Sequence, residues 1–170
     1  MNVELRAVQY DEKEILRNLL ELYMYELSPY LENVELNKYG LFGYRYLDHY
    51  WTEEGRFPFF IYASDKLAGF AMIRKFDVQS ENEFKWLMAE FFVIRKFQKQ
   101  GIGRIAAMQA FNRFPGTWIV AQIENNIPSR LFWEKVISEY TNGAYIQTKL
   151  GKQPAQEFVS PGGRNHRDKH

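Results

Sequence analysis

The feature that most constrains the fold of this chain is a strand that runs through a glycine turn into a helix, over residues 90–104. Residues 90–94 are mostly aromatic or β-branched, as in a buried strand, and an apolar stretch of helical length begins between Gly101 and Gly103. The first N–H groups of a helix have no intrahelical partner, and the helix dipole places partial positive charge there. The segment therefore predicts a site where main-chain amides bind an anion such as a phosphate.

The charge around this turn supports an anionic ligand. The segment from residue 91 to residue 123 contains no Asp or Glu. Its basic residues are Arg95, Lys96, Lys99, Arg104 and Arg113. The whole chain has a net charge of only +1, so the positive field is local. A Gly-x-Gly pair alone also occurs in ordinary turns, and the prediction depends on this charge and on the order of the elements.

Two motifs in this chain resemble those of the GCN5-related N-acetyltransferase (GNAT) superfamily. Residues 98–103, Gln-Lys-Gln-Gly-Ile-Gly, are similar to the family's Gln/Arg-x-x-Gly-x-Gly/Ala signature. Residues 126–135 resemble its later Asn-x-x-Ala-x-x-Phe-Tyr-Glu-Lys segment and follow the first motif by a helix and a strand. Including the element order, the resemblance covers residues 1–160.

The element pattern predicts an α/β (α+β) fold. Strands are predicted at residues 3–8, 57–63, 69–76, 84–94, 117–123, 144–150 and 155–160. Helices are predicted from an Asp11 cap, with Glu14 completing a capping box, to residue 27, and at residues 102–114 and 129–140. A second, partly broken helix is expected between residues 30 and 51. The resemblance implies a mixed, mostly antiparallel central sheet with helices on both faces.

Length and composition narrow the class of protein. At 170 residues we expect one domain over residues 1–160 and a disordered tail at 161–170. A net charge of +1 argues against nucleic acid as the main ligand. The absence of Cys fits a reducing compartment, and the sequence shows no signal peptide and no membrane span. A soluble cytoplasmic protein is expected.

The segment between the first helix and the hairpin is crowded with aromatic side chains. They are Tyr30, Tyr39, Phe42, Tyr44, Tyr46, Tyr50 and Trp51. Residues 1–60 also contain eleven acidic and six basic side chains. In the GNAT family this region borders the acceptor pocket, where such a surface would suit a cationic amine. The alternative, which the sequence favours, is that the aromatics are core and the acids are solvated.

The resemblance implies acetyl-CoA as the acyl donor, with its pyrophosphate held at the glycine turn. The expected binding residues at the turn are Gln98, Lys99, Gln100, Gly101, Ile102, Gly103 and Arg104. Main-chain groups of Phe92, Val93 and Ile94 would pair with the pantetheine arm, and the amide of Val93 is the best candidate to bind the thioester carbonyl. Asn126 and Ser129 carry over as further cofactor contacts.

The catalytic residues follow from the same resemblance. Glu90 is the candidate general base, since a protonated amine has no lone pair. The alternative is that Glu90 has no catalytic role and is only the last residue on one face of the strand, or the partner of a nearby lysine. Trp133 stands where the family often has a tyrosine as general acid, and an indole cannot serve as that acid. Either Tyr140 replaces it, or water assists the thiolate, or the reaction is slower.

Several alternatives stay open. A non-catalytic acyl-CoA-binding or sensing module would keep the turn and lose the proton-transfer groups. The sequence does not show whether the amine acceptor is a small molecule or a peptide. It also does not show whether the protein forms a homodimer. The three histidines, His49, His166 and His170, form no metal-binding pattern, so no metal is expected.

Overall fold

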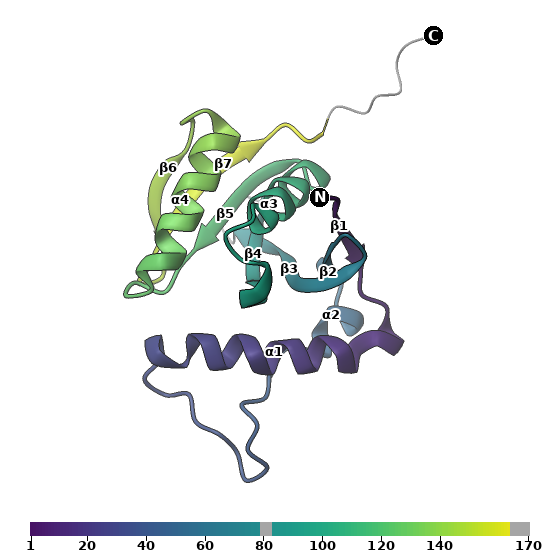
Figure 1. Cartoon of the computed structure of the whole chain (residues 1–170). Helices are drawn as coiled ribbons and strands as arrows, with labels where there is room; N and C mark the ends of the chain where they lie inside the picture. Colours follow the sequence, from purple (N-terminus) through teal and green to yellow (C-terminus); the bar gives the residue numbers. More distant parts are fainter. Residues whose placement is uncertain (79–82, 164–170) are drawn as a thin grey trace. The chain divides into compact units, whose positions relative to one another are not determined.

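The computed structural model describes residues 1–78 and 83–163. The elements follow the predicted order (Figure 1). They are β1 (Val3–Ala7), α1 (Lys13–Leu27), α2 (His49–Thr52), β2 (Arg56–Ala63), β3 (Lys66–Val78), β4 (Glu83–Val93), α3 (Ile102–Arg113), β5 (Gly116–Ala121), α4 (Ile127–Thr141), β6 (Ile146–Leu150) and β7 (Gln153–Ser160). Short 3₁₀ turns precede and follow α1, and a third, Arg95–Phe97, follows β4.

The strands form one mixed sheet in the order β1-β2-β3-β4-β5-β7-β6. The β1–β2, β2–β3, β5–β7 and β6–β7 pairs are antiparallel, whereas β4 and β5 are parallel. The parallel ladder joins Trp86 to Trp118 and Leu87 to Ile119. The predicted α/β class with a mixed, mostly antiparallel sheet is therefore confirmed.

The chain divides into two compact units that share strands β3 and β4. The first contains Met1–Arg74 and Ala89–Ile102, and the second contains Lys75–Met88 and the chain from Gly103 onward. The expected single domain over residues 1–160 stays a prediction. Disorder was expected for residues 161–170. Of these, residues 164–170, including His166 and His170, lie outside the described residues.

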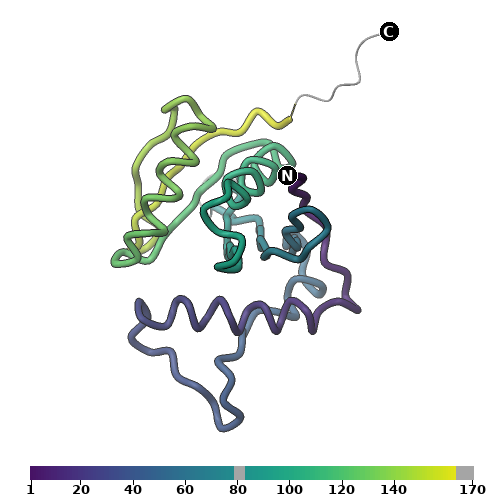
Figure 2. The backbone as a smooth tube through the Cα atoms, in the orientation of Figure 1, coloured from purple at the N-terminus to yellow at the C-terminus, as the bar shows by residue number. Residues whose placement is uncertain are grey.

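The core of the first unit joins α1 to the strands. Leu16, Leu19 and Leu20 recur on one face of the helix and are buried with Phe60 and Phe70. Because these residues recur at intervals of three and four positions, the helix could be predicted from the sequence. Figure 2 shows α1 as a straight helix, which a long and largely irregular segment connects to α2.

The core of the second unit is built around a fully buried tryptophan. Trp118 on β5 packs edge-on against Phe111 of α3, with ring centroids 5.0 Å apart. Phe111 also contacts Phe158 of β7 at 4.8 Å. Beside them, Gln122 and Gln156 are buried and exchange amide hydrogen bonds. The reciprocal pairing satisfies both side chains, as burial requires.

Two local predictions near the N-terminus were wrong. The capping box lies at Gln9, whose N–H donates to Glu12 Oε2 at 2.9 Å, and not at Asp11 and Glu14. A 3₁₀ turn comes first, so α1 begins at Lys13, later than an Asp11 cap predicts. The second helix is also shorter than expected, since only His49–Thr52 is helical between residues 31 and 55.

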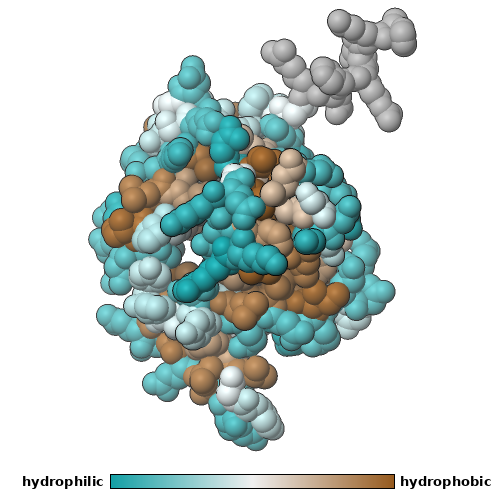
Figure 3. Space-filling view, viewed as in Figure 1, coloured by the Kyte–Doolittle hydropathy of each residue, from teal (hydrophilic) through white to brown (hydrophobic). Residues whose placement is uncertain are grey.

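The aromatic residues between α1 and β2 divide between core and surface. Tyr50 is buried, and Trp51 donates its indole N–H to the Val8 carbonyl at 3.2 Å. Tyr39, by contrast, is 74% exposed, and Leu36 is also exposed. Figure 3 shows apolar and polar side chains side by side over the lower part of the molecule, where this segment lies. The expectation of a purely core role for these aromatics was therefore only partly right.

Candidate active site

Glu90 is held by tyrosines from two other parts of the first unit. It lies on β4 and is partly buried. The hydroxyl of Tyr23, on α1, donates a hydrogen bond to Oε2 of Glu90. The hydroxyl of Tyr44, in the segment between α1 and α2, donates to Oε1 at 3.2 Å. Both carboxylate oxygens are thus engaged by neutral donors, and each donor comes from a segment distant in sequence.

This environment perturbs the pKa of all three groups. Burial raises the pKa of the Glu90 carboxyl above its ordinary value, and the hydrogen bonds from Tyr23 and Tyr44 partly oppose that rise. Burial, reinforced by the charge of Glu90, raises the pKa of both phenols, so they stay protonated donors at neutral pH. A carboxyl with a raised pKa is better matched to proton transfer near neutrality than an exposed one.

Glu90 has no cationic partner in the described part of the chain. The ion pairs found there join other residues, and the alternative that Glu90 pairs with a lysine is not what the structure shows. A partly buried carboxylate without a cation is destabilising unless polar groups or a ligand offset it. The two phenols supply part of that compensation.

A third tyrosine lies close to this group. Tyr50, on α2, is 4% exposed, and its hydroxyl has no hydrogen-bond partner among the described residues. Burial and the charge of Glu90 raise its pKa to about 12, although Arg56 and Arg74 act in the opposite direction. The sequence did not single out Tyr23, Tyr44 or Tyr50 as site residues. From the sequence, Tyr23 was interpreted only as part of the apolar face of the first helix. Tyr44 and Tyr50 were interpreted only as members of the aromatic-rich segment.

The main chain at the end of β4 presents one group away from its neighbour β3. The N–H of Ile94 donates to the Ala68 carbonyl at 2.8 Å. Gly69 approaches so closely that a Cβ there would lie 1.9 Å from the Phe92 oxygen. Phe92 and Ile94 therefore face β3, and because successive residues alternate, the N–H of Val93 points to the other side. The prediction of available groups at all three residues is therefore narrowed to the N–H of Val93, because the Val93 carbonyl accepts from Gln98. The role of this N–H toward a ligand stays a prediction.

The turn after β4 is closed by its own side chains. Gln98 donates its side-chain amide to the Val93 carbonyl at 2.8 Å, and Gln100 donates to the Lys96 carbonyl at 2.8 Å. Lys99 and Gly101 both have positive φ, at 59° and 80°. A Cβ at Gly101 would meet nothing within 4 Å, so glycine serves the backbone angle there and not a steric need. Gln100 between them does not have a positive φ, and this alternation of backbone conformation turns neighbouring N–H groups toward one side.

The helix that starts at Ile102 carries a cation that is already engaged. Arg104, in the first turn of α3, forms two hydrogen bonds to the carboxylate of Glu139 on α4, one of them at 2.8 Å. Both side chains are partly exposed. Arg104 must release Glu139, or share it, before its side chain can contact a phosphate. Lys99 is exposed and takes part in no ion pair found in the described residues.

Side chains of the second motif, residues 126–135, cap the helix α4 and pack against the core. Asn126 is the N-cap of α4, where its Oδ1 accepts the N–H of Ser129 at 3.2 Å. Trp133 is buried and tilts against Phe111, so its role is packing. The hydroxyl of Tyr140 donates to Asn112 at 2.8 Å and pairs with Ser160 at 2.7 Å. The expected roles of these residues in binding or catalysis stay predictions.

The family model for the acetyltransferase (GNAT) family matches residues 16–137. That span includes the strand of Glu90, the glycine turn and all of the second motif. The chain belongs to this family. A search among curated protein sequences gave no match.

Solved structures share the GNAT fold at low sequence identity. An acetyltransferase from Thermus thermophilus matches with a TM-score of 0.67 and 13% identity, covering 95% of this chain and 97% of that one. PaiA N-acetyltransferase from Thermoplasma acidophilum, solved in complex with coenzyme A, matches with a TM-score of 0.61 and 12% identity, covering 94% and 99%. An aminoglycoside acetyltransferase from an uncultured soil metagenomic sample, in complex with sisomicin, matches with a TM-score of 0.53 and 13% identity, covering 79% and 86%.

Two further observations concern metal ligands and membrane spans in this GNAT protein. Across residues 1–78 and 83–163, no group of three or more His, Cys, Asp or Glu side chains is arranged to hold a metal ion. In the same part of the chain, no helix has the length and apolar character needed to cross a membrane.

Proposed function

We propose that this GNAT protein transfers the acetyl group of acetyl-CoA directly to a primary amine while both substrates are bound. The observation that carries the proposal is Glu90, a partly buried carboxylate held by Tyr23 and Tyr44 without a cation partner in the described residues. It lies on the strand that leads into the glycine turn. A substrate ammonium ion would supply the missing positive charge.

Glu90 acts as the general base. The acceptor arrives as an ammonium ion and gives one proton to Glu90, which frees the nitrogen lone pair. The nitrogen attacks the carbonyl carbon of the thioester, so a C–N bond forms, and it then loses its second proton. The C–S bond breaks, the electron pair leaves with the sulfur, and the thiolate takes up a proton. The net products are an amide, free coenzyme A and one proton.

The main chain around the turn supplies orientation and electrostatic stabilisation. The N–H of Val93 is the donor we assign to the developing oxyanion, because it points away from β3. The amides from Lys99 to Arg104 are the donors we assign to the pyrophosphate, supported by the positive φ angles at Lys99 and Gly101. Holding both substrates in position accounts for much of the rate in this type of direct transfer.

We propose that water, and not Tyr140, protonates the leaving thiolate. Tyr140 lies seven residues after Trp133 on α4, which separates the two by roughly 10 Å along the axis. Its hydroxyl is engaged by Asn112 and Ser160. Thiols are much stronger acids than alcohols, with a pKa of about 8.5 for the Cys side chain. A thiolate is therefore an adequate leaving group without a protein acid.

The acceptor that fits this site best is a cationic primary amine. Two tyrosines bind the Glu90 carboxylate, and this combination of charge and aromatic rings favours an ammonium ion through charge and cation–π attraction. The soil-sample neighbour is an aminoglycoside acetyltransferase, which supports an amine as the kind of acceptor without identifying the one used here.

The test is a screen of primary amines with acetyl-CoA. Thiol release and the mass of the product are measured together, so that hydrolysis is distinguished from transfer. We expect acetylated product with at least one cationic amine. Acetyl-CoA binding by calorimetry without thiol release from any amine would contradict the enzyme and support a sensing module, an alternative favoured only by the packing role of Trp133.

A further inference from the structure

One carboxylate of α1 binds two consecutive amides of the segment between α1 and α2. Glu21 accepts the N–H of Phe42 on Oε2 and the N–H of Gly43 on Oε1, each at 2.8 Å. Gly43 has a φ of 73°, a left-handed conformation that glycine adopts without strain. The conformation directs two consecutive amides toward one anion, as in other main-chain anion sites.

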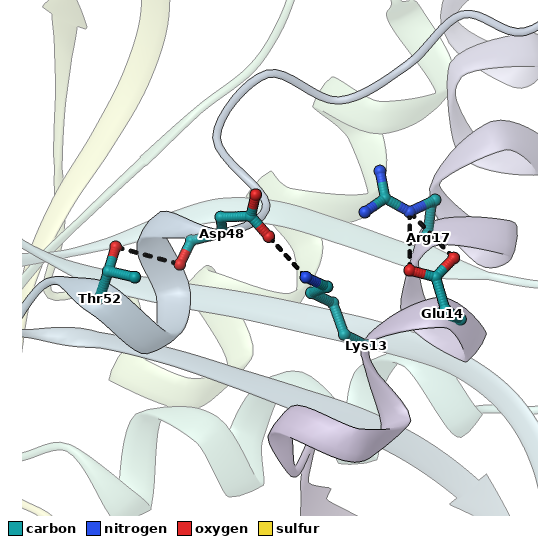
Figure 4. Close-up of polar contacts among 5 residues, drawn as sticks. All are labelled: Lys13, Glu14, Arg17, Asp48 and Thr52. Atoms are coloured by element: carbon teal, nitrogen blue, oxygen red, sulfur yellow. Dashed lines mark hydrogen bonds and ion pairs between the residues drawn. The ribbon is translucent and has the colours of Figure 1, made fainter.

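A second contact holds the far end of the same segment. Lys13 forms an ion pair with Asp48, with Nζ 2.8 Å from Oδ1, and the hydroxyl of Thr52 donates to the Asp48 carbonyl at 3.2 Å (Figure 4). The two anchors enclose residues 44–47. Leu47 is the buried residue of that stretch.

Tyr44 lies directly after the amides that Glu21 binds. Its hydroxyl donates to Glu90, and its ring is edge-on to Tyr46. Much of the segment before it is exposed, including Leu36, Tyr39 and Leu41. The ring of Tyr44 packs against the core of the first unit, and Leu47 is buried in that core, so apolar contacts hold the ring. The backbone of the turn before Tyr44 is fixed by the bonds from Glu21 on one side and by the Asp48 contact on the other.

We propose that Glu21 is a positioning residue of the acceptor site, which holds the 42–44 turn so that the Tyr44 hydroxyl stays on Glu90. The inference rests on the proposed function of Glu90 as the base. Through Tyr44, Glu21 sets both the access of an amine to Glu90 and the pH at which Glu90 gives up its proton.

The direction of the pH effect follows from the groups that face Glu90. They are Tyr23 from α1, Tyr44 from the intervening segment and Tyr50 from α2, with Arg56 of β2 and Arg74 of β3 acting on Tyr50. The hydrogen bond from Tyr44 lowers the pKa of Glu90. Loss of this bond, by removing either the phenol or the residue that positions it, moves the acidic limb of the activity profile to higher pH.

The experiment compares wild type, Glu21→Ala, Tyr44→Phe and the double variant. We expect each single variant to raise the KM of the amine about two- to tenfold and to shift the acidic limb of kcat/KM to higher pH. Because both changes remove the same contact, the double variant should go no further than either single one. Glu21→Gln, which keeps one acceptor oxygen, should fall between Glu21→Ala and wild type.

The matched control is Glu14→Ala. Glu14 is an exposed acid of the same helix that pairs with Arg17 (Figure 4). This variant should leave the amine KM and the pH profile unchanged, and acetyl-CoA affinity should be unchanged in every variant. The proposal is overturned if Glu21→Ala keeps the wild-type profile, or if its effect adds in full to that of Tyr44→Phe.

A second readout separates this inference from the proposed function. Carbon-13 NMR of labelled glutamate carboxyls follows the titration of Glu90 without turnover, with Glu90→Gln assigning the signal. If no amine is acetylated but Glu21→Ala still raises the pKa of Glu90, the positioning role stands and the enzymatic role fails. If amines are acetylated and the titration does not move, the positioning role fails alone.

Discussion

Tyr23 of α1 donates a hydrogen bond to Oε2 of Glu90 on β4, across 67 positions of sequence. The ring of Tyr23 is itself fixed between Phe70 and Phe92, with centroids 5.5 and 5.8 Å away. The contact therefore has a defined geometry, and it ties the ionisation of Glu90 to the packing of the first helix.

Tyr23→Phe should move the acidic limb of the activity profile to higher pH. The variant keeps the ring packing and removes only the hydroxyl, whose hydrogen bond lowers the pKa of Glu90. Glu90 must be ionised to accept a proton, so a higher pKa means that activity appears only at higher pH. The measurement is kcat/KM for the amine against pH. Tyr39→Phe, on the exposed surface, is the control, and an unchanged profile in Tyr23→Phe would contradict the contact.

Glu90→Gln should become more stable relative to wild type as the pH rises. Burial raises the pKa of Glu90 in the folded protein above its value of 4.5 in the unfolded chain. The folded state therefore binds the proton more tightly, and the contribution of Glu90 to stability is complete below that value and is lost as the pH rises through the folded pKa. Thermal unfolding of both proteins from acidic to neutral pH gives the difference in Tm. A difference that stays constant, or that falls with pH, would show that burial does not penalise the charge.

Gly101→Ala should weaken acetyl-CoA binding through the backbone alone. The site has a φ of 80° and open space around it, so alanine brings strain of about 1–2 kcal/mol without a clash. Relief of that strain would reorient the amides before α3, and we expect about a tenfold higher Kd by calorimetry. Gly151→Ala is the matched control, since Gly151 has a φ of 60° and open space in the β6–β7 turn. Equal affinity in the two variants would argue against a site at the turn.

Glu139→Gln should tighten acetyl-CoA binding by about two- to fivefold at low salt. Glu139 holds the Arg104 guanidinium with two hydrogen bonds, and its removal frees the cation for a phosphate. Arg104→Gln should have the opposite effect, and added salt should reduce both. If neither variant changes the Kd at low salt, the side chain of Arg104 does not contact the ligand.

The fold was readable from the sequence because its signals are local. The apolar spacing of Leu16, Leu19 and Leu20 predicted α1, and the glycine turn between β4 and α3 was correctly placed. The capping box was misplaced because a 3₁₀ turn precedes the helix at Tyr10–Glu12. Gln9 and Asp11 each lie three residues before a glutamate, so both pairs give a similar pattern.

The candidate site was only partly readable, since its contacts join distant residues. Glu90 was noticed as an acid in an apolar strand, but nothing in the sequence connects it to Tyr23 or Tyr44. The same holds for Arg104, whose pairing with Glu139 depends on the packing of α3 and α4. That the N–H of Val93 points away from β3 could be inferred only once the pairing of Ile94 with Ala68 was known.

The most direct test of the account is the turnover of Glu90→Gln with an amine that the wild-type protein acetylates. The variant keeps the shape of the side chain and an oxygen for the tyrosines, and it removes the base. We predict that kcat/KM for the amine falls about 10²- to 10⁴-fold while the Kd for acetyl-CoA is unchanged. Turnover at the wild-type rate across the pH range would contradict the account.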